Sequence, residues 1–175
     1  MKKHLNQHVF VKRCYVTKTR KKKEYQGIMP MNLMGGSEAP MMAKKEELPK
    51  VLIVDDDAEM VYLAQYLLEQ SGYQSDTAMD LKGFHKAYAE LPAVVMLDLT
   101  MPDNISEDVC KIMVEHHAKH PIIFVTGMPP EEIERRRKQA EAQGLKIAAI
   151  LHKPFWIEDI ASAMSIAMTL VMAES

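Results

Sequence analysis

Short apolar segments of strand length alternate with segments of helical period five times after residue 50. Four of the apolar segments carry no charged residue, a pattern typical of strands that are buried on both faces. Such strands belong to parallel sheets whose two faces are covered by helices. The sequence therefore predicts an α/β fold, a doubly wound five-stranded parallel sheet with helices on both faces. The predicted strands are residues 51–54, 73–78, 93–97, 121–125 and 147–151.

Helix signals follow each predicted strand. Apolar residues recur there at spacings of three and four, and Gly72 and Gly144 are placed to end two of the helices. Asp80 is a predicted N-cap, and Pro130 opens a long, highly charged helix. The predicted helices lie around residues 62–71, 81–91, 107–117, 130–143 and 157–173.

Charged and polar residues stand where the predicted strands end. Three acids follow the first strand, Asp98 follows the third, Thr126 follows the fourth and Lys153 follows the fifth. In such sheets, binding sites form at the carboxyl ends of the strands. Two carboxylates about 4 Å apart repel each other by roughly 4 kcal/mol at an effective dielectric constant of 20. The acids Asp55, Asp56 and Asp98 therefore predict a site for a hard divalent cation, and Mg²⁺ suits oxygen ligands.

The same residues predict a reaction with a phosphoryl group. Asp98 is flanked by apolar residues at a strand end and can act as a carboxylate nucleophile. Its attack brings two negatively charged groups together, so Mg²⁺ and the Lys153 amine would offset that charge. Thr126 supplies a hydroxyl donor, and Gly127 leaves room for backbone amides to approach a phosphoryl oxygen.

These motifs resemble the receiver domain of two-component response regulators. The resemblance covers residues 50–175 and includes the acid pair Asp55–Asp56, the DLTMPD segment at 98–103, Thr126–Gly127 and the Lys153-Pro154-Phe155 segment. It implies that Asp98 is the phospho-acceptor and that the backbone carbonyl of Thr100 also ligates Mg²⁺. It implies too that a cis peptide bond precedes Pro154.

The resemblance also implies how the protein would signal. We expect a stand-alone receiver that takes a phosphoryl group from a sensor histidine kinase or a phosphotransfer protein and then loses it to water. Such a protein phosphorylates and dephosphorylates itself and is not a turnover enzyme. We expect its output to pass to a downstream protein at the face made by the fourth helix, the fifth strand and the fifth helix. Ala163, Ile166, Ala167 and Leu170 leave an apolar excess on the last helix for a partner or a second copy.

Three positions depart from the family pattern. Ile150 stands three residues before Lys153, where an aromatic residue is usual, so the usual coupling between hydroxyl and aromatic ring is open to question. Ser106 stands where the loop usually has glycine and is predicted to cap the following helix. The segment from Thr126 to Lys153 is longer than usual. These departures motivate an alternative, a receiver-like interaction module that works without phosphorylation.

Two further function classes fit less well. An aspartate-nucleophile phosphatase of the dehalogenase-like type needs a second acid two residues beyond the nucleophile, and Thr100 stands there. The histidines at 116, 117 and 120 have no carboxylate at ligand spacing, which disfavours a metal site among them.

The basic leader at residues 1–49 differs from the rest of the chain. Residues 1–28 carry nine Lys or Arg and one acid, whereas residues 50–175 carry 11 basic and 20 acidic residues. The leader shows no sustained period and is predicted to be disordered. It is either a basic arm that touches nucleic acid, the less favoured interpretation, or an over-extended gene start with later methionines available. No apolar run is long enough to span a bilayer, and two cysteines make no framework, so we expect a cytoplasmic protein without a membrane partner.

Overall fold

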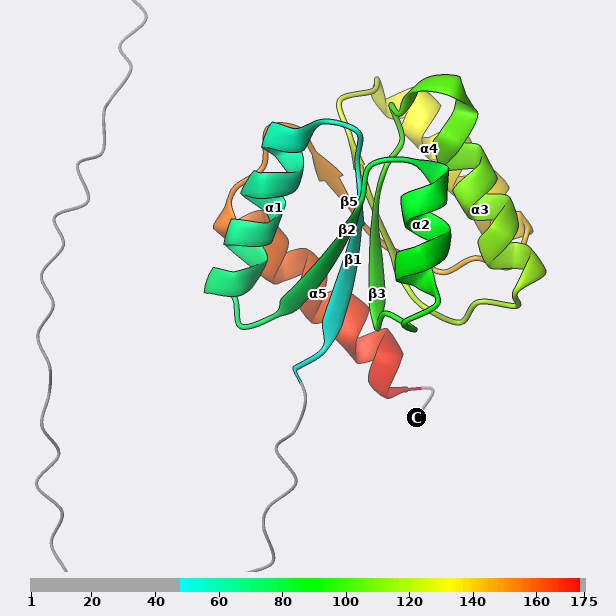
Figure 1. Cartoon of the computed structure of the whole chain (residues 1–175). Helices are drawn as coiled ribbons and strands as arrows, with labels where there is room; N and C mark the ends of the chain where they lie inside the picture. The colour runs from blue at the N-terminus through cyan, green and yellow to red at the C-terminus, as the bar shows by residue number, and fades with distance from the viewer. Residues whose placement is uncertain (1–47, 174–175) are drawn as a thin grey trace, which may run out of the picture. The chain divides into compact units, whose positions relative to one another are not determined.

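A computed structural model describes residues 48–173 of the chain, so nearly all of the predicted leader at 1–49 lies outside the described residues. The described part is a five-stranded parallel sheet with helices on both faces (Figure 1). The predicted fold class is confirmed. Its strands are β1 (Lys50–Val54), β2 (Gln74–Ala78), β3 (Val94–Asp98), β4 (Ile122–Thr126) and β5 (Ile147–His152). Its α-helices are α1 (Ala58–Gln70), α2 (Leu81–Tyr88), α3 (Ile105–Glu115), α4 (Pro130–Ala142) and α5 (Ile157–Met172), with a short 3₁₀ turn at Pro102–Asn104.

The strand order is β2-β1-β3-β4-β5, so the winding direction reverses between β1 and β3. Residues Val51 to Val54 of β1 pair in parallel register with Val94 to Leu97 of β3. The crevice outside the carboxyl ends of two such strands is where doubly wound sheets bind their ligands. The residues that follow Val54 and Leu97 therefore stand at this crevice.

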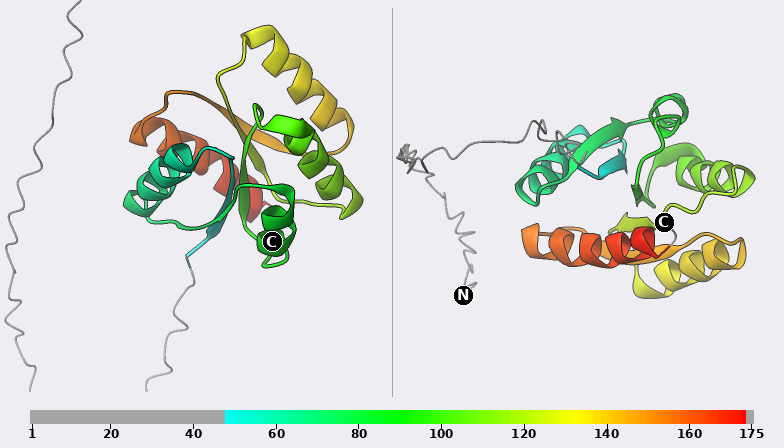
Figure 2. Two further views of the ribbon diagram at one scale, coloured as in Figure 1. Left: turned by 45° about the horizontal axis from the view of Figure 1, so that its top comes forward. Right: turned by 90° about the horizontal axis from the view of Figure 1, so that it is seen from below.

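Two apolar cores fill the space between the sheet and its helices. The first lies under α1 and α5 and includes Leu68, Ile160 and Met164. The second lies under α2 and α3 and includes Phe84 and Met113. Figure 2 shows the same division, with α1 and α5 on one side of the sheet and the other three helices on the opposite side. The strands β1 and β3 are buried almost throughout, as their unbroken apolar sequences predict.

Local hydrogen bonds explain where several helices begin. Asp57 is the N-cap of α1, since its carboxylate accepts from the backbone amides of Glu59 and Met60 at 2.9 and 3.4 Å. Asp80 caps α2 as predicted and accepts from the Gly83 amide at 2.6 Å. The predicted boundaries hold within a few residues elsewhere, but α2 ends at Tyr88 and not at Leu91, whose φ of 54° is left-handed.

The predicted cap at Ser106 is wrong. Helix α3 begins at Ile105, with Asn104 as its N-cap residue, because Asp103 and Asn104 adopt left-handed conformations that end the preceding turn. Ser106 therefore lies inside the first turn, where it is buried and its hydroxyl donates to the Leu99 carbonyl at 3.4 Å.

The apolar excess predicted on the last helix, α5, is smaller than expected. Ala163 and Ala167 are core residues, and of the four predicted residues only Ile166 and Leu170 reach solvent.

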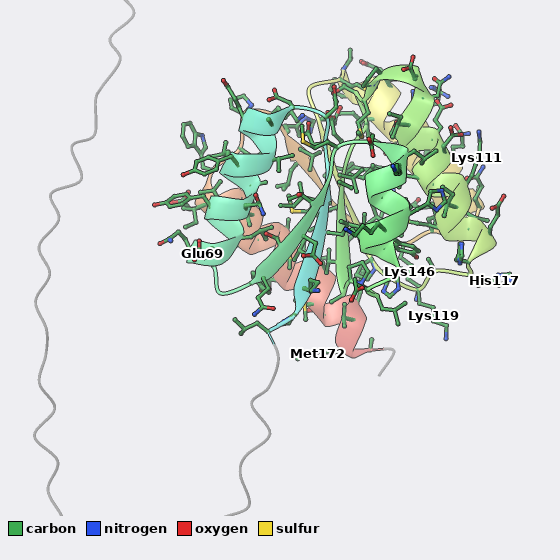
Figure 3. The ribbon with its side chains drawn as sticks, in the orientation of Figure 1. Glu69, Lys111, His117, Lys119, Lys146 and Met172 are labelled. Carbon is green, nitrogen blue, oxygen red and sulfur yellow. The ribbon has the colours of Figure 1, made fainter. Side chains whose placement is uncertain are left out.

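No helix in the described part of the chain is long and apolar enough to cross a bilayer. The edge of the sheet at which the strands begin carries basic residues, among them Lys119 and Lys146, which are labelled in Figure 3. The strand-end acids lie at the opposite edge of the sheet.

Replacing Phe84 by alanine should lower the free energy of unfolding by about 3–5 kcal/mol. Its ring is wholly buried in the second core and stacks on Tyr88 with the two ring centroids 4.9 Å apart. Urea denaturation followed by circular dichroism measures the change. The matched control is Tyr62→Ala on α1, because the Tyr62 ring is 73% exposed and its loss should leave the urea midpoint nearly unchanged. Equal midpoints for the two variants would contradict this packing.

Candidate active site

Four side chains from four different strand ends meet at one edge of the sheet. Asp55 directly follows β1, Asp98 is the last residue of β3, Thr126 is the last residue of β4 and Lys153 directly follows β5. The four strands are consecutive in the sheet, and all are parallel, so their carboxyl ends lie together at the upper edge in Figure 1. Sequence spacing alone predicts this gathering, and the structure confirms it.

The Lys153 ammonium joins the two buried acids. Its Nζ lies 2.8 Å from Asp55 Oδ2 and 3.0 Å from Asp98 Oδ2. The side chains of Asp55 and Asp98 are only 6% and 4% exposed, whereas that of Lys153 is 20% exposed. Burial lowers the pKa of Lys153, but its hydrogen bonds and charge interactions with the two acids outweigh this and raise that pKa above its ordinary value. The amine is therefore firmly protonated at neutral pH.

Burial also acts on Asp55. It raises the pKa of the Asp55 carboxyl above its ordinary value, against the opposing effects of the Lys153 hydrogen bond and the Asp57 amide. A raised pKa means that the negative charge is costly at this position without further compensation. One lysine facing this set of acids supplies only part of that compensation.

The acids themselves have the composition of a metal site. Oxygen atoms of Asp55, Asp56 and Asp98 all lie within 4.8 Å of one another. With all three carboxylates ionised and Lys153 protonated, two negative charges remain, which a divalent cation would balance. Hard oxygen ligands at this separation suit Mg²⁺. The residues present thus fit the cation that their sequence predicts.

Similar short turns follow three of the strands. The Asp57 amide donates to Asp55 Oδ1 at 2.9 Å, the Thr100 amide donates to Asp98 Oδ1 at 2.9 Å, and the Met128 amide donates to Thr126 Oγ1 at 3.0 Å. In each case a side chain at the strand end accepts from the backbone two residues later. These turns fix the direction of the three side chains at the edge of the sheet.

Thr100 makes a contact that the sequence analysis missed. Its hydroxyl lies 2.7 Å from Asp98 Oδ1 and 2.8 Å from Oδ2. Together with Lys153 and the Thr100 amide, this hydroxyl covers both oxygens of Asp98. The signal was present in the sequence, because a hydroxyl residue two positions after a strand-end aspartate can reach back to its carboxylate. The predicted ligand at this residue was its carbonyl oxygen, which stays a prediction.

Thr126 stands one residue beyond Val125, the register partner of Asp98 in the neighbouring strand β4. Its side chain is fully buried, and its oxygen accepts from Met128, which leaves the hydroxyl hydrogen to be donated elsewhere. The Thr126 carbonyl accepts from the Lys153 amide at 2.9 Å, so these two strand ends are joined directly. The peptide bond between Lys153 and Pro154 is cis, as predicted.

Ile150, at the position where the family usually has an aromatic residue, lies within β5 and is half-buried. It pairs in register with Phe124 of β4 and belongs to the edge of the second core. An aliphatic side chain without a polar tip cannot take part in a hydrogen bond to Thr126. Ile150 therefore leaves the Thr126 hydroxyl without the aromatic partner that is usual at this position.

Replacing Lys153 by methionine should destabilise the metal-free protein by about 3 kcal/mol, because two buried carboxylates lose their shared partner. Adding Asp98→Asn to that variant should restore part of the loss, since one of the two charges disappears. Urea denaturation in the presence of a chelator measures both effects. Lys111→Met is the control, because Lys111 pairs with Asp108 on the outer surface of α3 (Figure 3) and its loss should not move the midpoint. Unchanged stability of Lys153→Met would show that the bridge does not hold the acids.

Curated relatives share part of this chain. Over 83 residues it is 37% identical to the alkaline phosphatase synthesis transcriptional regulatory protein PhoP of Bacillus subtilis (strain 168), covering 47% of this chain and 35% of that protein. Over 118 residues it is 31% identical to the DNA-binding dual master transcriptional regulator RpaA of Synechocystis sp. (strain ATCC 27184 / PCC 6803 / Kazusa), covering 65% of this chain and 46% of that protein. The chain thus spans between a third and a half of the length of these relatives.

Solved structures show the same fold. A response regulator receiver domain protein from Clostridium thermocellum aligns with a TM-score of 0.63 at 21% identity, covering 73% of this chain and all of that one. A CheY-like receiver domain protein from Methanospirillum hungatei JF-1 aligns equally well at 22% identity, covering 73% and 99% of the two chains. Residues 51–165 match the response regulator receiver domain, and this range includes Asp55, Asp98, Thr126 and Lys153. The chain belongs to the response regulator receiver domain family.

Proposed function

We propose that the protein acts in a phosphorelay by accepting a phosphoryl group on Asp98. The observation that carries this proposal is the buried Asp98 carboxylate, held between the Lys153 ammonium and the acids Asp55 and Asp56 at the reversal point of the sheet. The donor would be a phosphohistidine on a sensor histidine kinase or a phosphotransfer protein. A carboxylate oxygen of Asp98 attacks phosphorus, the P–N bond breaks, and its electron pair goes to the histidine imidazole.

The remaining residues would lower the cost of bringing negative groups together. Asp55, Asp56, Asp98 and the Thr100 carbonyl would hold Mg²⁺, which supplies positive charge to the transferring phosphoryl oxygens. Lys153 already donates a hydrogen bond to Asp98 and would donate a charge-assisted hydrogen bond to one phosphoryl oxygen. The Thr126 hydroxyl, whose hydrogen is left available, would donate to another.

Attack by Asp98 would alter the hydrogen bonds that its carboxylate now accepts. Both of its oxygens accept hydrogen bonds from Thr100, and Oδ2 also accepts from Lys153. The Thr100 hydroxyl has one hydrogen to donate, so it can stay bonded to one carboxylate oxygen while the other bonds to phosphorus. The acyl phosphate then loses its phosphoryl group to water, so the protein modifies and restores itself and does not turn over a separate substrate.

A downstream protein would read the phosphorylated state at the face formed by α4, β5 and α5. Strand β5 is the open edge of the sheet, and its residues from Ile147 to Ile150 are only half-buried. On α5, Ile166 is 51% exposed. This face offers apolar contacts to a partner or to a second copy.

A phosphohistidine donor would place the protein in the cytoplasm, and nothing in the described residues favours nucleic acid as its partner.

The alternative is a receiver-like module whose contacts do not depend on phosphorylation. Ile150 favours it, because this residue lacks the polar ring that would couple the Thr126 hydroxyl to the β5 surface. Equal affinity for a partner before and after phosphorylation would support this alternative. The complete set of strand-end residues favours the phospho-acceptor.

Incubation with acetyl phosphate and Mg²⁺ should add one phosphoryl group to the protein, as measured by intact mass. Asp98→Asn should abolish the addition, because an amide is not a nucleophile of this kind, and a chelator should suppress it in the unchanged protein. Asp103→Asn is the matched control, since Asp103 is an exposed acid in the turn after β3. The backbone of Asp103 is left-handed, and asparagine also tolerates that conformation. Addition of the group to Asp98→Asn at the normal rate would refute the proposal.

A further inference from the structure

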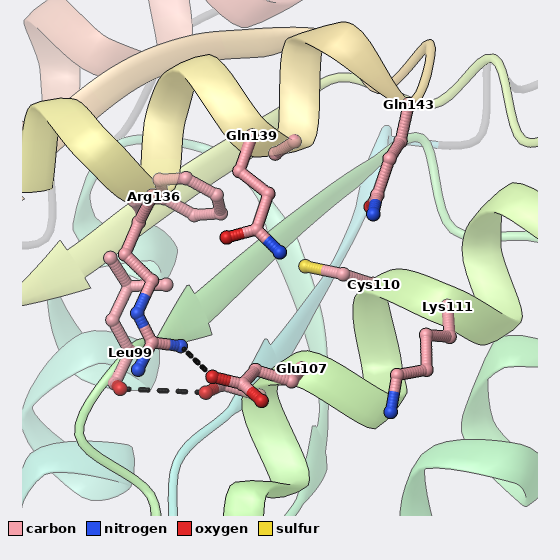
Figure 4. Close-up of a pocket in the computed structure, with 10 residues that line it drawn as sticks. Leu99, Glu107, Cys110, Lys111, Arg136, Gln139 and Gln143 are labelled. Carbon is pink, nitrogen blue, oxygen red and sulfur yellow. Dashed lines mark hydrogen bonds and ion pairs between the residues drawn. The ribbon is translucent and has the colours of Figure 1, made fainter.

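Helices α3 and α4 do not close completely against each other. A hollow of about 70 Å³ lies between them and is lined by Leu99, Cys110, Phe124 and Ala140 among others; Figure 4 labels Leu99 and Cys110. That volume holds about five water molecules. Leu99 adjoins Asp98, and Phe124 lies two residues before Thr126, so the hollow is next to the strand ends of the proposed acceptor site.

The hollow persists because α4 has few apolar residues with which to fill it. Only Ile133 and Ala140 of this helix are buried. Across the rim, Arg136 of α4 forms an ion pair with Glu107 of α3, with 2.8 Å between Nη1 and Oε1. This pair holds the two helices at a fixed separation, while the small side chains at 110 and 140 leave the space below it open.

The charges around the hollow are already paired. Arg136 also contacts Glu132 at 3.3 Å, and Lys111 pairs with Asp108 at 2.8 Å. Burial raises the pKa of the Cys110 thiol to about 11, so this group is neutral and apolar at physiological pH. A charged ligand would find no unpaired opposite charge among the lining residues, and a neutral molecule would lose little by leaving water.

Two neutral polar side chains that line the hollow are available to bind a ligand. Gln139 lies in the last turn of α4 and Gln143 directly follows the helix, and Figure 4 shows both amides directed toward Cys110 across the hollow. Within residues 48–173 neither amide has a hydrogen-bond partner in the protein. Each offers a donor and an acceptor, so together they present an edge that another amide can match.

We propose that this hollow is a binding site for a small, neutral, planar molecule that carries a carboxamide or a similar donor–acceptor edge. Its ring would enter the hollow between Cys110 and Ala140, and its polar edge would bond to the amides of Gln139 and Gln143. A bound molecule touches both α3 and α4, so its occupancy holds α4 in place.

Benzamide is a suitable probe, because it combines one planar ring with one neutral amide. Titrated into the full-length protein and followed by amide NMR, it should bind with a Kd on the order of 1 mM, as expected for so few atoms. Gln139→Leu combined with Gln143→Leu should weaken binding by about tenfold, since each lost hydrogen bond removes part of a small total. Both glutamines are exposed, so the fold should tolerate these changes. Gln70→Leu, at the exposed end of α1, is the matched control and should bind benzamide normally.

Alkylation of Cys110 gives a second measurement. In a Cys14→Ser background Cys110 is the remaining cysteine of the chain. Benzamide at about ten times its Kd should slow alkylation by about tenfold, because a filled hollow covers the thiol. Gln70→Leu in the same background should show the same protection.

Three results would overturn the inference. One is the absence of saturable benzamide binding at about 20 mM, well above the expected Kd. Another is equal binding of benzoate or toluene, which would mean that a neutral amide edge is not what the site selects. The third is benzamide binding that the paired glutamine substitutions leave unchanged.

Discussion

The contact between Lys153 and the two buried acids determines what the edge of this sheet can do. Asp55 and Asp98 stand at the carboxyl ends of the neighbouring strands β1 and β3, and both are almost excluded from water. Buried carboxylates at this separation are costly unless a cation balances them. Lys153 reaches both from the far side of β4 and provides part of that balance. The negative charge that remains on the three acids suits a divalent cation.

The backbone supports this arrangement by the same local hydrogen bond at three strand ends. After β1, β3 and β4, the strand-end side chain accepts a hydrogen bond from the amide two residues later. The turns fix the directions of the Asp55, Asp98 and Thr126 side chains, and they do so with backbone groups that need a partner in any case. Thr100 adds its hydroxyl to the Asp98 carboxylate. The Asp98 carboxylate is thereby held in a defined position at the end of β3.

Local sequence signals predicted most of the fold and the composition of the site. The unbroken apolar runs at β1, β3 and β4 defined buried parallel strands, and strand-end positions then placed Asp98, Thr126 and Lys153 together. Ser106 was misassigned because the left-handed turn at Asp103 and Asn104 moved the helix start by two residues. The hollow between α3 and α4 depends on how two distant helices pack around Cys110 and Ala140, which no local pattern encodes.

The most direct test of the account is to locate the phosphoryl group chemically. Borohydride reduces an acyl phosphate on aspartate to homoserine, which peptide mapping by mass spectrometry can place in the sequence. After treatment with acetyl phosphate and Mg²⁺, the account predicts homoserine at position 98 and its loss when Mg²⁺ is chelated. Homoserine at another aspartate, or a phosphorylated protein with no homoserine at 98, would contradict the assignment of Asp98 as the acceptor.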